Sequence, residues 1–474
     1  MSSSVQTRRR AAGTSRKWAC LVGFSCGLFL ALAAGPAAAQ QPAGRIAFDT
    51  YTLSNGLTVV LSEDHTVPVA TVNVWYHVGS ANERARRSGF AHLFEHMMFQ
   101  GSANVRKSEH MQFVERAGGS MNGSSHEDRP NYFETLPSNR LNLGLWLEAD
   151  RMRSLAINQT NFENQRQTVK EERRLGVDNQ PYARAFLTAQ TAVFDSTACF
   201  AYAHTVIGDM ADLDSARVED VQAFFNQYYA PNNAVLTIVG DFDPAEARRL
   251  VQQYYGDIPR AGDPPAVRCD VRFAPGTRRL EMTDDNANLP LVGLLYRVPA
   301  ISDADGPALE MLGSILSDGE SSRLNRRLVR EERAAMQAAG FTDLRRSAGL
   351  LFFLAINNQG VETARIERLL NEEVDRVRND SIPQAELTKA HNQYRAGVVR
   401  QRQTAMGIAE ALQGALWFMG SLDAVNSDVQ RRLAVPTADL RRVAQRYLTP
   451  ENRLTVIANP PAGLGVNLDD TGHR

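Results

Sequence analysis

Residues 220–233 read Asp-Val-Gln-Ala-Phe-Phe-Asn-Gln-Tyr-Tyr-Ala-Pro-Asn-Asn, and the apolar stretch Leu236-Thr-Ile-Val239 follows them. Near the end of the chain, residues 439–452 read Asp-Leu-Arg-Arg-Val-Ala-Gln-Arg-Tyr-Leu-Thr-Pro-Glu-Asn and precede Leu454-Thr-Val-Ile457. Each copy predicts a helix, a stop that contains proline, and a buried strand. Because self-similarity of this kind is typical of duplicated units, we expect two homologous halves.

The beginnings of the two halves are also alike. Residues 68–78 and 290–298 are apolar and β-branched, which predicts a strand in each half, and a helix-like segment follows each strand. The region between the halves is rich in proline and lacks periodic apolar residues. We therefore divide the chain into a first half at 45–258, a linker at 259–276 and a second half at 277–464.

Other local patterns indicate that helices and strands mix within each half. Asn55-Gly56 lies between two apolar runs, as in a tight hairpin. Residues 161–175 are rich in Glu, Gln, Arg and Lys, as helices are. A chain of 474 residues is also too long for one compact core. The predicted fold class is α+β, with an antiparallel-rich sheet and helices packed on one face in each half.

The composition excludes several classes of protein. Hydrophobic residues make up 43% of the chain and charged residues 22%, as in a soluble globular protein rather than a disordered or fibrous one. The formal net charge is −1, so no overall field favours nucleic acid or an anionic membrane as a partner.

The first 39 residues differ from the rest. A positively charged start is followed by an apolar run from Trp18 to Ala34 and by Ala37-Ala38-Ala39. This pattern is typical of a secretory signal peptide cleaved after Ala39. The alternative is a membrane anchor, since the run is near the short limit for a span; the alanine-rich exit favours cleavage. We expect a periplasmic or secreted bacterial protein with no stable membrane span after cleavage.

Two cysteines, Cys199 and Cys269, remain after the leader. An oxidising compartment would permit a disulfide between them, but the sequence does not show whether they lie close together.

A candidate metal site lies in residues 89–99, Gly-Phe-Ala-His-Leu-Phe-Glu-His-Met-Met-Phe, which predict a helix. His92 and His96 are four residues apart, so their imidazoles share one face and suit a single Zn²⁺. Glu95 points to nearly the same face, where a carboxylate can act as general base. Burying three polar groups in an apolar stretch without a partner would cost several kcal/mol, and a metal removes that cost.

A catalytic zinc usually has three protein ligands, so another element should bring the third. The helical run 165–172 offers Glu171 and Glu172. Consecutive helical positions are about 100° apart, so only one of these carboxylates can face the metal.

The His-x-x-Glu-His motif, with Glu172 placed 76 residues after His96, resembles the pitrilysin/insulinase family of inverted-zincin metallopeptidases. That family includes the mitochondrial processing peptidase β subunit. The resemblance extends over nearly the whole chain after the leader. It includes Gly119-x-x-Asn122, the block at 228–233 and Ser321-Ser-Arg323. It implies two homologous halves that form a clamshell.

The resemblance also implies roles for individual residues. His92, His96 and Glu172 would hold one Zn²⁺ per chain, with Glu95 as the base. Glu171 would then be solvated or lie next to the ligands. Gln165 stands where family members often have a second glutamate; its amide can orient a neighbour but carries no charge.

In the second half, Leu309, Leu312 and Gly313 stand where His92, Glu95 and His96 stand in the first. The resemblance therefore identifies this half as the inactive one that closes over the substrate.

Substrate contacts are expected from both halves. Asn122 is a candidate for holding the substrate backbone, with a turn as the equally weighted alternative. Arg330 matches a substrate-binding arginine of the family, but the tyrosine that usually follows is Met336, which cannot donate a hydrogen bond. Since some bacterial relatives work as two-chain complexes, we expect this chain to be the zinc-bearing partner of a paralogous subunit without the zinc motif.

The predicted function is that of a zinc metalloendopeptidase acting on peptides or unfolded segments. One alternative is a non-catalytic subunit that binds peptides or supports assembly, although such a subunit would not need Glu95. Another is a structural zinc site, which usually has four protein ligands. The surplus candidates His77, His110 and His126 lack ligand spacing, and neither His126 nor His204 is assigned a role.

Overall fold

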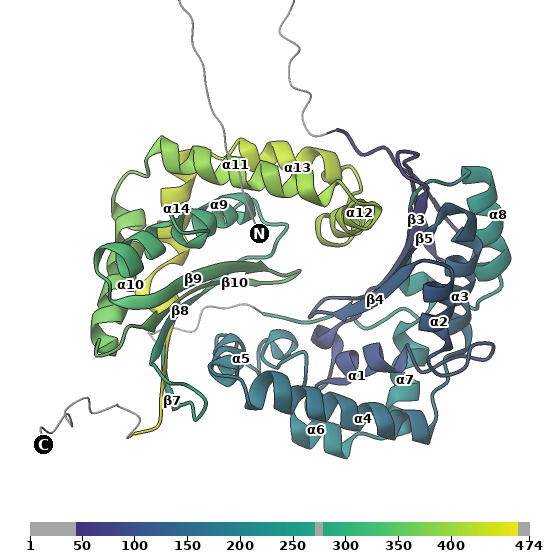
Figure 1. Cartoon of the computed structure of the whole chain (residues 1–474), viewed down its shortest axis with the longest axis horizontal. Coiled ribbons are helices and arrows are strands. Elements are labelled where there is room, and N and C mark those ends of the chain that lie inside the picture. The colour runs from purple at the N-terminus through teal and green to yellow at the C-terminus, as the bar shows by residue number, and fades with distance from the viewer. Residues whose placement is uncertain (1–43, 271–277, 463–474) are drawn as a thin grey trace, which may run out of the picture. The chain divides into compact units, whose positions relative to one another are not determined.

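The computed structural model describes residues 44–270 and 278–462 (Figure 1). The leader predicted at 1–39 and the last part of the predicted linker lie outside these residues. Contacts divide the chain at Gly44, and everything below concerns the compact unit that begins at Arg45. Among the described residues, no helix combines the length and the apolar character needed to cross a bilayer.

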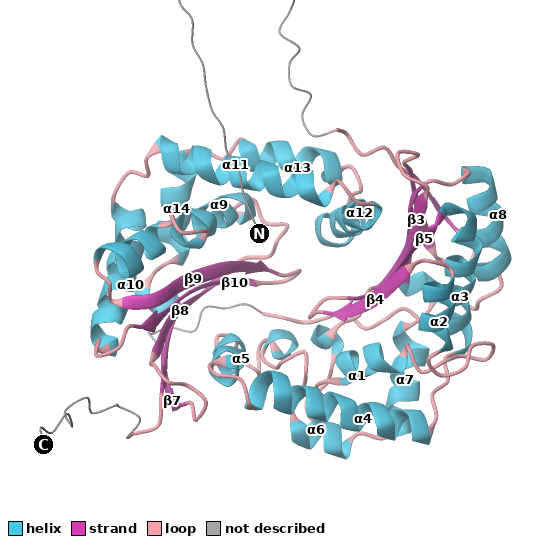
Figure 2. Cartoon of the chain, viewed as in Figure 1, coloured by secondary structure: helices cyan, strands magenta, loops and turns pink. Residues whose placement is uncertain are grey.

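The first sheet has six strands in the order β1-β2-β6-β3-β5-β4. Figure 2 shows its strands β3, β4 and β5 in magenta. Their bounds are β1 (Asp49–Thr52), β2 (Thr58–Glu63), β3 (Val69–Tyr76), β4 (Ser120–Ser125), β5 (Pro130–Pro137) and β6 (Ala234–Gly240). The second sheet has five strands in the order β7-β11-β8-β10-β9. Their bounds are β7 (Arg278–Thr283), β8 (Leu291–Val298), β9 (Ala335–Leu344), β10 (Gly349–Asn357) and β11 (Arg453–Asn459).

The two sheets repeat one topology. In the first, β6 pairs in parallel with β2 and antiparallel with β3; in the second, β11 pairs in parallel with β7 and antiparallel with β8. All other strand pairs are antiparallel. The prediction of two α+β halves with antiparallel-rich sheets is therefore confirmed.

The repeated sequence block folds in the same way twice. In the first half it forms α7 (Val218–Tyr228), a 3₁₀ turn and β6. In the second it forms α14 (Thr437–Tyr447), a 3₁₀ turn and β11. Asn233 donates to the carbonyls of Tyr228 and His77, and Asn452 donates to the equivalent carbonyls of Tyr447 and Arg297.

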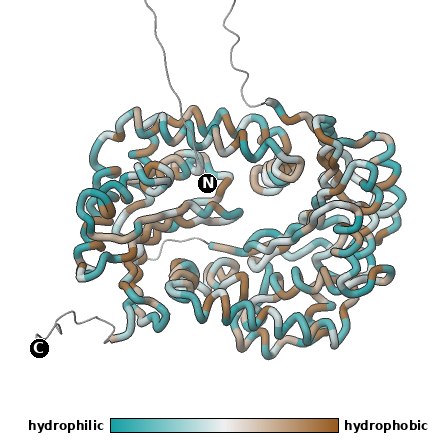
Figure 3. Tube along the Cα trace, viewed as in Figure 1, coloured by the Kyte–Doolittle hydropathy of each residue, from teal (hydrophilic) through white to brown (hydrophobic). Residues whose placement is uncertain are grey.

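Helices cover one face of each sheet. Those of the first half are α1 (Phe90–Met97), α2 (Glu109–Arg116), α3 (Leu141–Ser154), α4 (Gln159–Arg173), α5 (Ala183–Ala192), α6 (Met210–Ser215), α7 and α8 (Pro244–Tyr255). Those of the second half are α9 (Gly306–Ser317), α10 (Thr363–Asn379), α11 (Gln384–Gln401), α12 (Ala405–Met419), α13 (Ala424–Leu433) and α14. Several helices alternate hydrophilic and hydrophobic segments along their length (Figure 3), which is the amphipathic pattern of helices that bury one side.

The expectation that helices lie on only one face is wrong in part. Along β2, Val59 and Leu61 join the core under α1, α3 and α8, whereas Val60 points the other way and packs with α12. The side-chain period of two in a strand accounts for this division. Similarly, α5 packs on the second face of the second sheet through Ala189. Each half therefore covers part of the other half's sheet.

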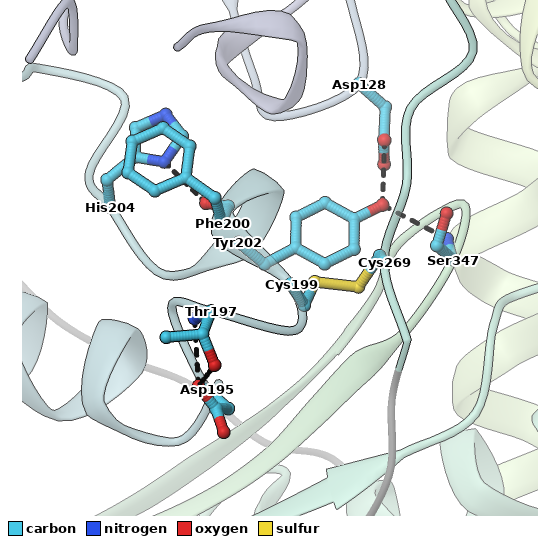
Figure 4. The surroundings of a disulfide bond; sticks show 9 residues. All are labelled: Asp128, Asp195, Thr197, Cys199, Phe200, Tyr202, His204, Cys269 and Ser347. Carbon is cyan, nitrogen blue, oxygen red and sulfur yellow. Dashed lines mark hydrogen bonds between the residues drawn. A yellow bond between two sulfur atoms is a disulfide. The ribbon is translucent and has the colours of Figure 1, made fainter. Parts of the chain in front are cut away.

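Two further features of the sequence, the Asn55-Gly56 pair and the two cysteines, can be located in the structure. Asn55-Gly56 forms the turn between β1 and β2, which pair antiparallel as the hairpin prediction requires. Gly56 has φ +93°, a value that favours glycine. Cys199 and Cys269 form a disulfide (Figure 4), which joins the segment after α5 to the predicted linker.

Candidate metal centre

The His-x-x-Glu-His motif lies on α1, as predicted. The helix begins after Gly89, whose φ of +85° is left-handed. Its apolar side, with Leu93, Phe94 and Met97, is buried in the main core of the first half. Since these side chains fix one side of the helix, the polar side chains at the other positions of the motif face out of the core.

The third candidate ligand arrives on α4. This helix packs against α1 and buries Phe162 and Val169 in the same core. Glu172 lies one residue before its end. Its carboxylate oxygens lie 3.7 Å from His92 Nε2 and 3.2 Å from His96 Nε2. The two imidazole rings are nearly perpendicular, with centroids 4.9 Å apart.

The geometry of this group fits a zinc ion. One donor atom from each of His92, His96 and Glu172 lies within 4.8 Å of the other two. Ligand atoms about 2.1 Å from a tetrahedral zinc lie about 3.4 Å from one another, close to the His–Glu separations seen here. Within the part of the chain that the structure describes, no fourth His, Cys, Asp or Glu joins the group. Two imidazoles, one carboxylate and an open position form the donor set of catalytic zinc sites.

The surroundings set the charge state of these groups. Burial, together with the neighbouring His96, lowers the pKa of His92 to about 4. At neutral pH its imidazole is therefore uncharged, the form that can bind a metal. Burial raises the pKa of Glu95, and a hydrogen bond from Ser125 opposes that shift. A carboxyl group whose pKa is raised is better suited to accept a proton near neutral pH.

These residues face a cavity of about 540 Å³. His92, Glu95 and Glu172 line it together with residues of β4, α5, the segment 202–207 and one residue of the second half, Arg345. The apolar part of the lining comes from Val177, Ala183, Phe186, Leu187, Val206 and Ile207. The cavity thus offers a polar reaction centre beside an apolar wall.

Two other predicted residues on α4 do not reach the group. Gln165 is buried, and its amide donates to Asn164. Glu171 is exposed and forms an ion pair with Arg174 at 2.9 Å. Of the two adjacent glutamates, Glu172 is therefore the one that faces the histidines.

The two residues predicted to contact the substrate, Asn122 and Arg330, are not part of the candidate metal centre either. Asn122 is exposed on β4, the edge strand of the first sheet, and accepts a bond from the backbone amide of Gly123. Arg330 is exposed at the end of a π-helical turn (Asn325–Glu331) and pairs with Glu320. Neither side chain lines the cavity, so their contacts with substrate stay predictions.

The corresponding helix of the second half has no such site. Leu309, Leu312 and Gly313 of α9 are buried. A Cβ atom at Gly313 would lie 2.2 Å from Thr342 Oγ1 on β9, so a side chain there would require Thr342 to move.

A second acidic cluster consists of His110, Glu134 and Glu148, all buried. His110 lies 2.8 Å from Glu134, and the Arg151 guanidinium contacts Glu148. Burial raises the pKa of both carboxyls and lowers that of His110 to about 3. Because Arg151 already supplies a cation here, this cluster is less suited to a metal ion than the partly exposed group on α1 and α4.

Sequence reasoning missed several residues around the cavity. Arg345, from the turn between β9 and β10, pairs with Glu127 at 2.9 Å and reaches the cavity from the second half. Glu83 contacts the start of α1, and His204 bonds to Glu83. No local pattern marks these residues, because Arg345 pairs with Glu127 and His204 pairs with Glu83 across large separations in sequence.

Comparison with known proteins agrees with this geometry. Residues 58–198 match the family model described as insulinase (peptidase family M16), and residues 215–394 match the one described as the peptidase M16 inactive domain. The second match covers much of the half in which α9 lacks the histidines.

Relatives of similar length carry names of the same kind. The zinc protease PqqE of Helicobacter pylori is 30% identical over 420 residues, which cover 87% of this chain and 93% of that protein. The mitochondrial-processing peptidase subunit beta of Lentinula edodes is 23% identical, over 84% of this chain and 86% of that one.

A solved structure is similar throughout. The crystal structure of a protease from Helicobacter pylori matches with a TM-score of 0.84 and 28% identity, covering 88% of this chain and all of that one. Sequence models, a relative of nearly full length and the fold thus agree, and the chain belongs to the insulinase family of peptidases, peptidase family M16.

Proposed function

We propose that this chain is a zinc-dependent endopeptidase that hydrolyses peptides or unfolded segments. The observation that carries the proposal is the convergence of His92, His96 and Glu172 at one point, with Glu95 lining the same cavity. A structural zinc site would usually have four protein ligands. A protein that only binds peptides would have no need of a half-buried carboxylate beside the candidate ligands.

The chain's own residues would divide the work as follows. When bound between His92, His96 and Glu172, Zn²⁺ supplies a Lewis acid that polarises a carbonyl and makes water more acidic. Glu95 accepts the proton of the attacking water and returns it to the leaving amine. Ser125 lines the same cavity and lowers the pKa of Glu95, which favours the carboxylate form that can accept a proton.

The substrate would bind as an added strand. Among the residues that the structure describes, β4 pairs only with β5, so its other edge offers backbone groups near the cavity, which Gly123, Ser124 and Ser125 help to line. An extended peptide can bond to such an edge through its main chain, with little dependence on its side chains. Asn122 lies on this strand and is exposed, as a residue that holds a substrate backbone must be.

The test separates metal binding from turnover. Replacing Glu95 by Gln should leave the zinc content at one per chain and lower peptide hydrolysis by about 10²- to 10⁴-fold, because the amide cannot accept the proton. Glu171→Gln is the matched control, since this neighbouring acid is exposed and should change neither quantity. Unchanged hydrolysis in Glu95→Gln would rule out the proposed role of Glu95.

We also propose a paralogous partner. Met336 lies on β9, the edge strand of the second sheet, and is 56% exposed. At this place the chain presents no hydroxyl group that could bond to the substrate, and a second chain would supply one. Hydrolysis by the isolated chain should rise when a paralogue without the zinc motif is added; full activity of the isolated chain would contradict this.

A location outside the cytoplasm is part of the proposal. Disulfides persist in oxidising compartments, and Cys199 and Cys269 form one. Fractionation of cells that produce the full chain, with immunodetection, would decide between a periplasmic or secreted protein and a cytoplasmic one.

A further inference from the structure

One wall of the cavity contacts both helices that carry the candidate ligands. We call residues 199–208 the wall segment. At its end, Gly208 lies against Gly89 so closely that a Cβ atom on Gly208 would come within 2.4 Å of Gly89 Cα. Arg173, the neighbour of Glu172 on α4, donates to the carbonyl of Gly208. The position of this segment therefore affects the start of α1 and the end of α4.

The start of α1 is held by a buried carboxylate. Glu83 is fully buried and accepts hydrogen bonds from the backbone amides of Gly89 at 2.9 Å and Ala91 at 2.7 Å. These amides belong to the first turn, which has no partners within the helix and carries partial positive charge. Glu83 thus holds the first turn of α1 in place, and His92 is the next residue of this helix.

The charge of Glu83 is balanced from the wall segment. His204 Nε2 lies 3.0 Å from a Glu83 oxygen and 2.9 Å from the carbonyl oxygen of Ser80. His204 Nδ1 lies 2.7 Å from the carbonyl oxygen of Phe200, whose ring stacks on the imidazole (Figure 4). Carbonyl oxygens only accept hydrogen bonds, so both ring nitrogens must donate, and only the imidazolium form can do so.

The electrostatics agree with this reading. Burial would lower the pKa of His204, but the bond to Glu83 and the two backbone carbonyls outweigh it, so the pKa is raised. Burial raises the pKa of Glu83, and the contacts with His204 and the two backbone amides act in the opposite sense. Other titratable or charged groups lining this cavity are Glu127, Glu172, Arg345, His92, Glu95 and Tyr202. Arg345 is already paired with Glu127, so Glu83 is the acid in direct contact with His204.

The wall segment is itself anchored on its other side. Cys199 is bonded to Cys269, and Tyr202 donates to Asp128 at 2.9 Å and accepts from the backbone amide of Ser347 at 3.0 Å (Figure 4). These bonds connect the segment to the linker, to the first sheet and to the second half. His204 therefore projects from a fixed support, as a residue that positions another element must.

We propose that His204, held as an imidazolium by Glu83, is a positioning residue for the metal centre. The pair ties the start of α1 to the wall segment and so sets the distance between the histidines on α1 and Glu172 on α4. The positioning role of His204 rests on the proposed function, since it concerns a zinc site. The charge state of His204 does not, because it can be measured without zinc or substrate.

The first experiment measures that charge state in the metal-free full chain. Histidine ring nitrogens are labelled with ¹⁵N, and the His204 signals are identified by their loss in His204→Gln. At pH 7.5 we expect two protonated ring nitrogens in the wild type and a neutral ring in Glu83→Gln. A neutral His204 in the wild type would overturn the proposal, whatever the chain's activity proves to be.

The second experiment asks whether the pair positions the ligands. Zinc affinity, measured by competition with a chelator, should fall about 10- to 100-fold in Glu83→Gln and in His204→Gln, as it does when residues that orient ligands are lost. The double variant should lose less than the product of the single effects, because it leaves no unpaired buried charge. A contact that is merely structural would lower stability in the variants but leave zinc affinity unchanged, and that result would refute the positioning role.

The matched control is His65→Gln. His65 is 61% exposed and pairs with Asp241, away from the wall segment. It should keep the wild-type zinc affinity. If wild type and control bind no zinc while His204 is an imidazolium, the proposed function fails and the charge assignment stands, so the two failures are distinguishable.

Discussion

Helices α1 and α9 occupy equivalent places in the two halves but differ in what surrounds them. Each follows a strand that pairs with the repeated strand, β3 with β6 and β8 with β11. On α1, His92 and Glu95 line a cavity together with Glu172 of α4, whereas the equivalent positions of α9, Leu309, Leu312 and Gly313, are buried. The duplicated scaffold is thus shared, and the capacity to bind a metal depends on whether the motif positions of the helix face a cavity or the core.

The largest expected effect is at the motif positions of α1. Replacing His96 by Ala should abolish zinc binding and peptide hydrolysis together, because two protein ligands hold zinc far more weakly than three. The equivalent position of α9, Gly313, should be irrelevant to zinc content. Metal analysis of purified protein checks this, and a variant that kept zinc would remove the distinction between the halves.

Introducing the His-x-x-Glu-His motif into α9 tests whether this helix lacks only the ligand residues or also the space for their side chains. Leu309→His, Leu312→Glu and Gly313→His together should leave the zinc content unchanged and lower the free energy of unfolding by about 3–5 kcal/mol. The reason is that the new polar groups would be buried and a Cβ at 313 would clash with Thr342. Urea unfolding gives the stability. A second zinc ion per chain would show that these three positions of α9 can reach a metal after all.

The repeated asparagines should matter equally in both halves. Asn233→Ala and Asn452→Ala each leave two backbone carbonyls without their donor, and each should cost about 1–3 kcal/mol of stability. Urea denaturation of both single variants is the measurement. If only one of them were destabilised, the two copies would not be energetically equivalent.

The smallest effects concern pH, and they should have opposite signs in the two halves. Asp305 precedes α9; although burial would raise its pKa, bonds from Arg442 and Tyr447 lower it below 3.8. A lowered pKa in the folded state gives stability that is present above pH 4 or so and is lost as the pH falls further.

His204 beside α1 has a pKa raised above 6.5, so its contribution is present below that pH and is lost as the pH rises through the folded value. Asp305→Asn should therefore flatten the acid side of a stability profile, and His204→Gln the alkaline side. Thermal melts from pH 3 to 10 would show it, and a shift of the same side by both variants would contradict the assignment.

The sequence predicted those features that depend on near neighbours. The four-residue spacing of His92 and His96 fixes a helix face, and Asn55-Gly56 fixes a hairpin turn; both are confirmed. The choice between Glu171 and Glu172 came from family resemblance, because helical geometry shows only that one of them faces the metal. In the structure Glu172 lies beside the histidines.

Features that depend on contacts between residues far apart in the sequence were not predicted. His204 and Glu83 are 121 residues apart, and Glu410 of α12 accepts from Asn73 of β3 across 337 residues. No periodicity links such positions, since the pairing is set by how whole helices and sheets come together. The disulfide is the same kind of case, because two cysteines 70 residues apart in sequence pair only if the fold brings them together.

The packing of α12 on the first sheet has a consequence for producing the two halves as separate fragments. A fragment that stopped within the linker would leave Val60, Val235 and Val239 without the apolar side chains of α12 that cover them. It would also lose Glu410, which accepts from Trp75 and Asn131. Neither half should be soluble when it is produced alone. Co-production of the two halves from separate reading frames should restore a soluble complex of both.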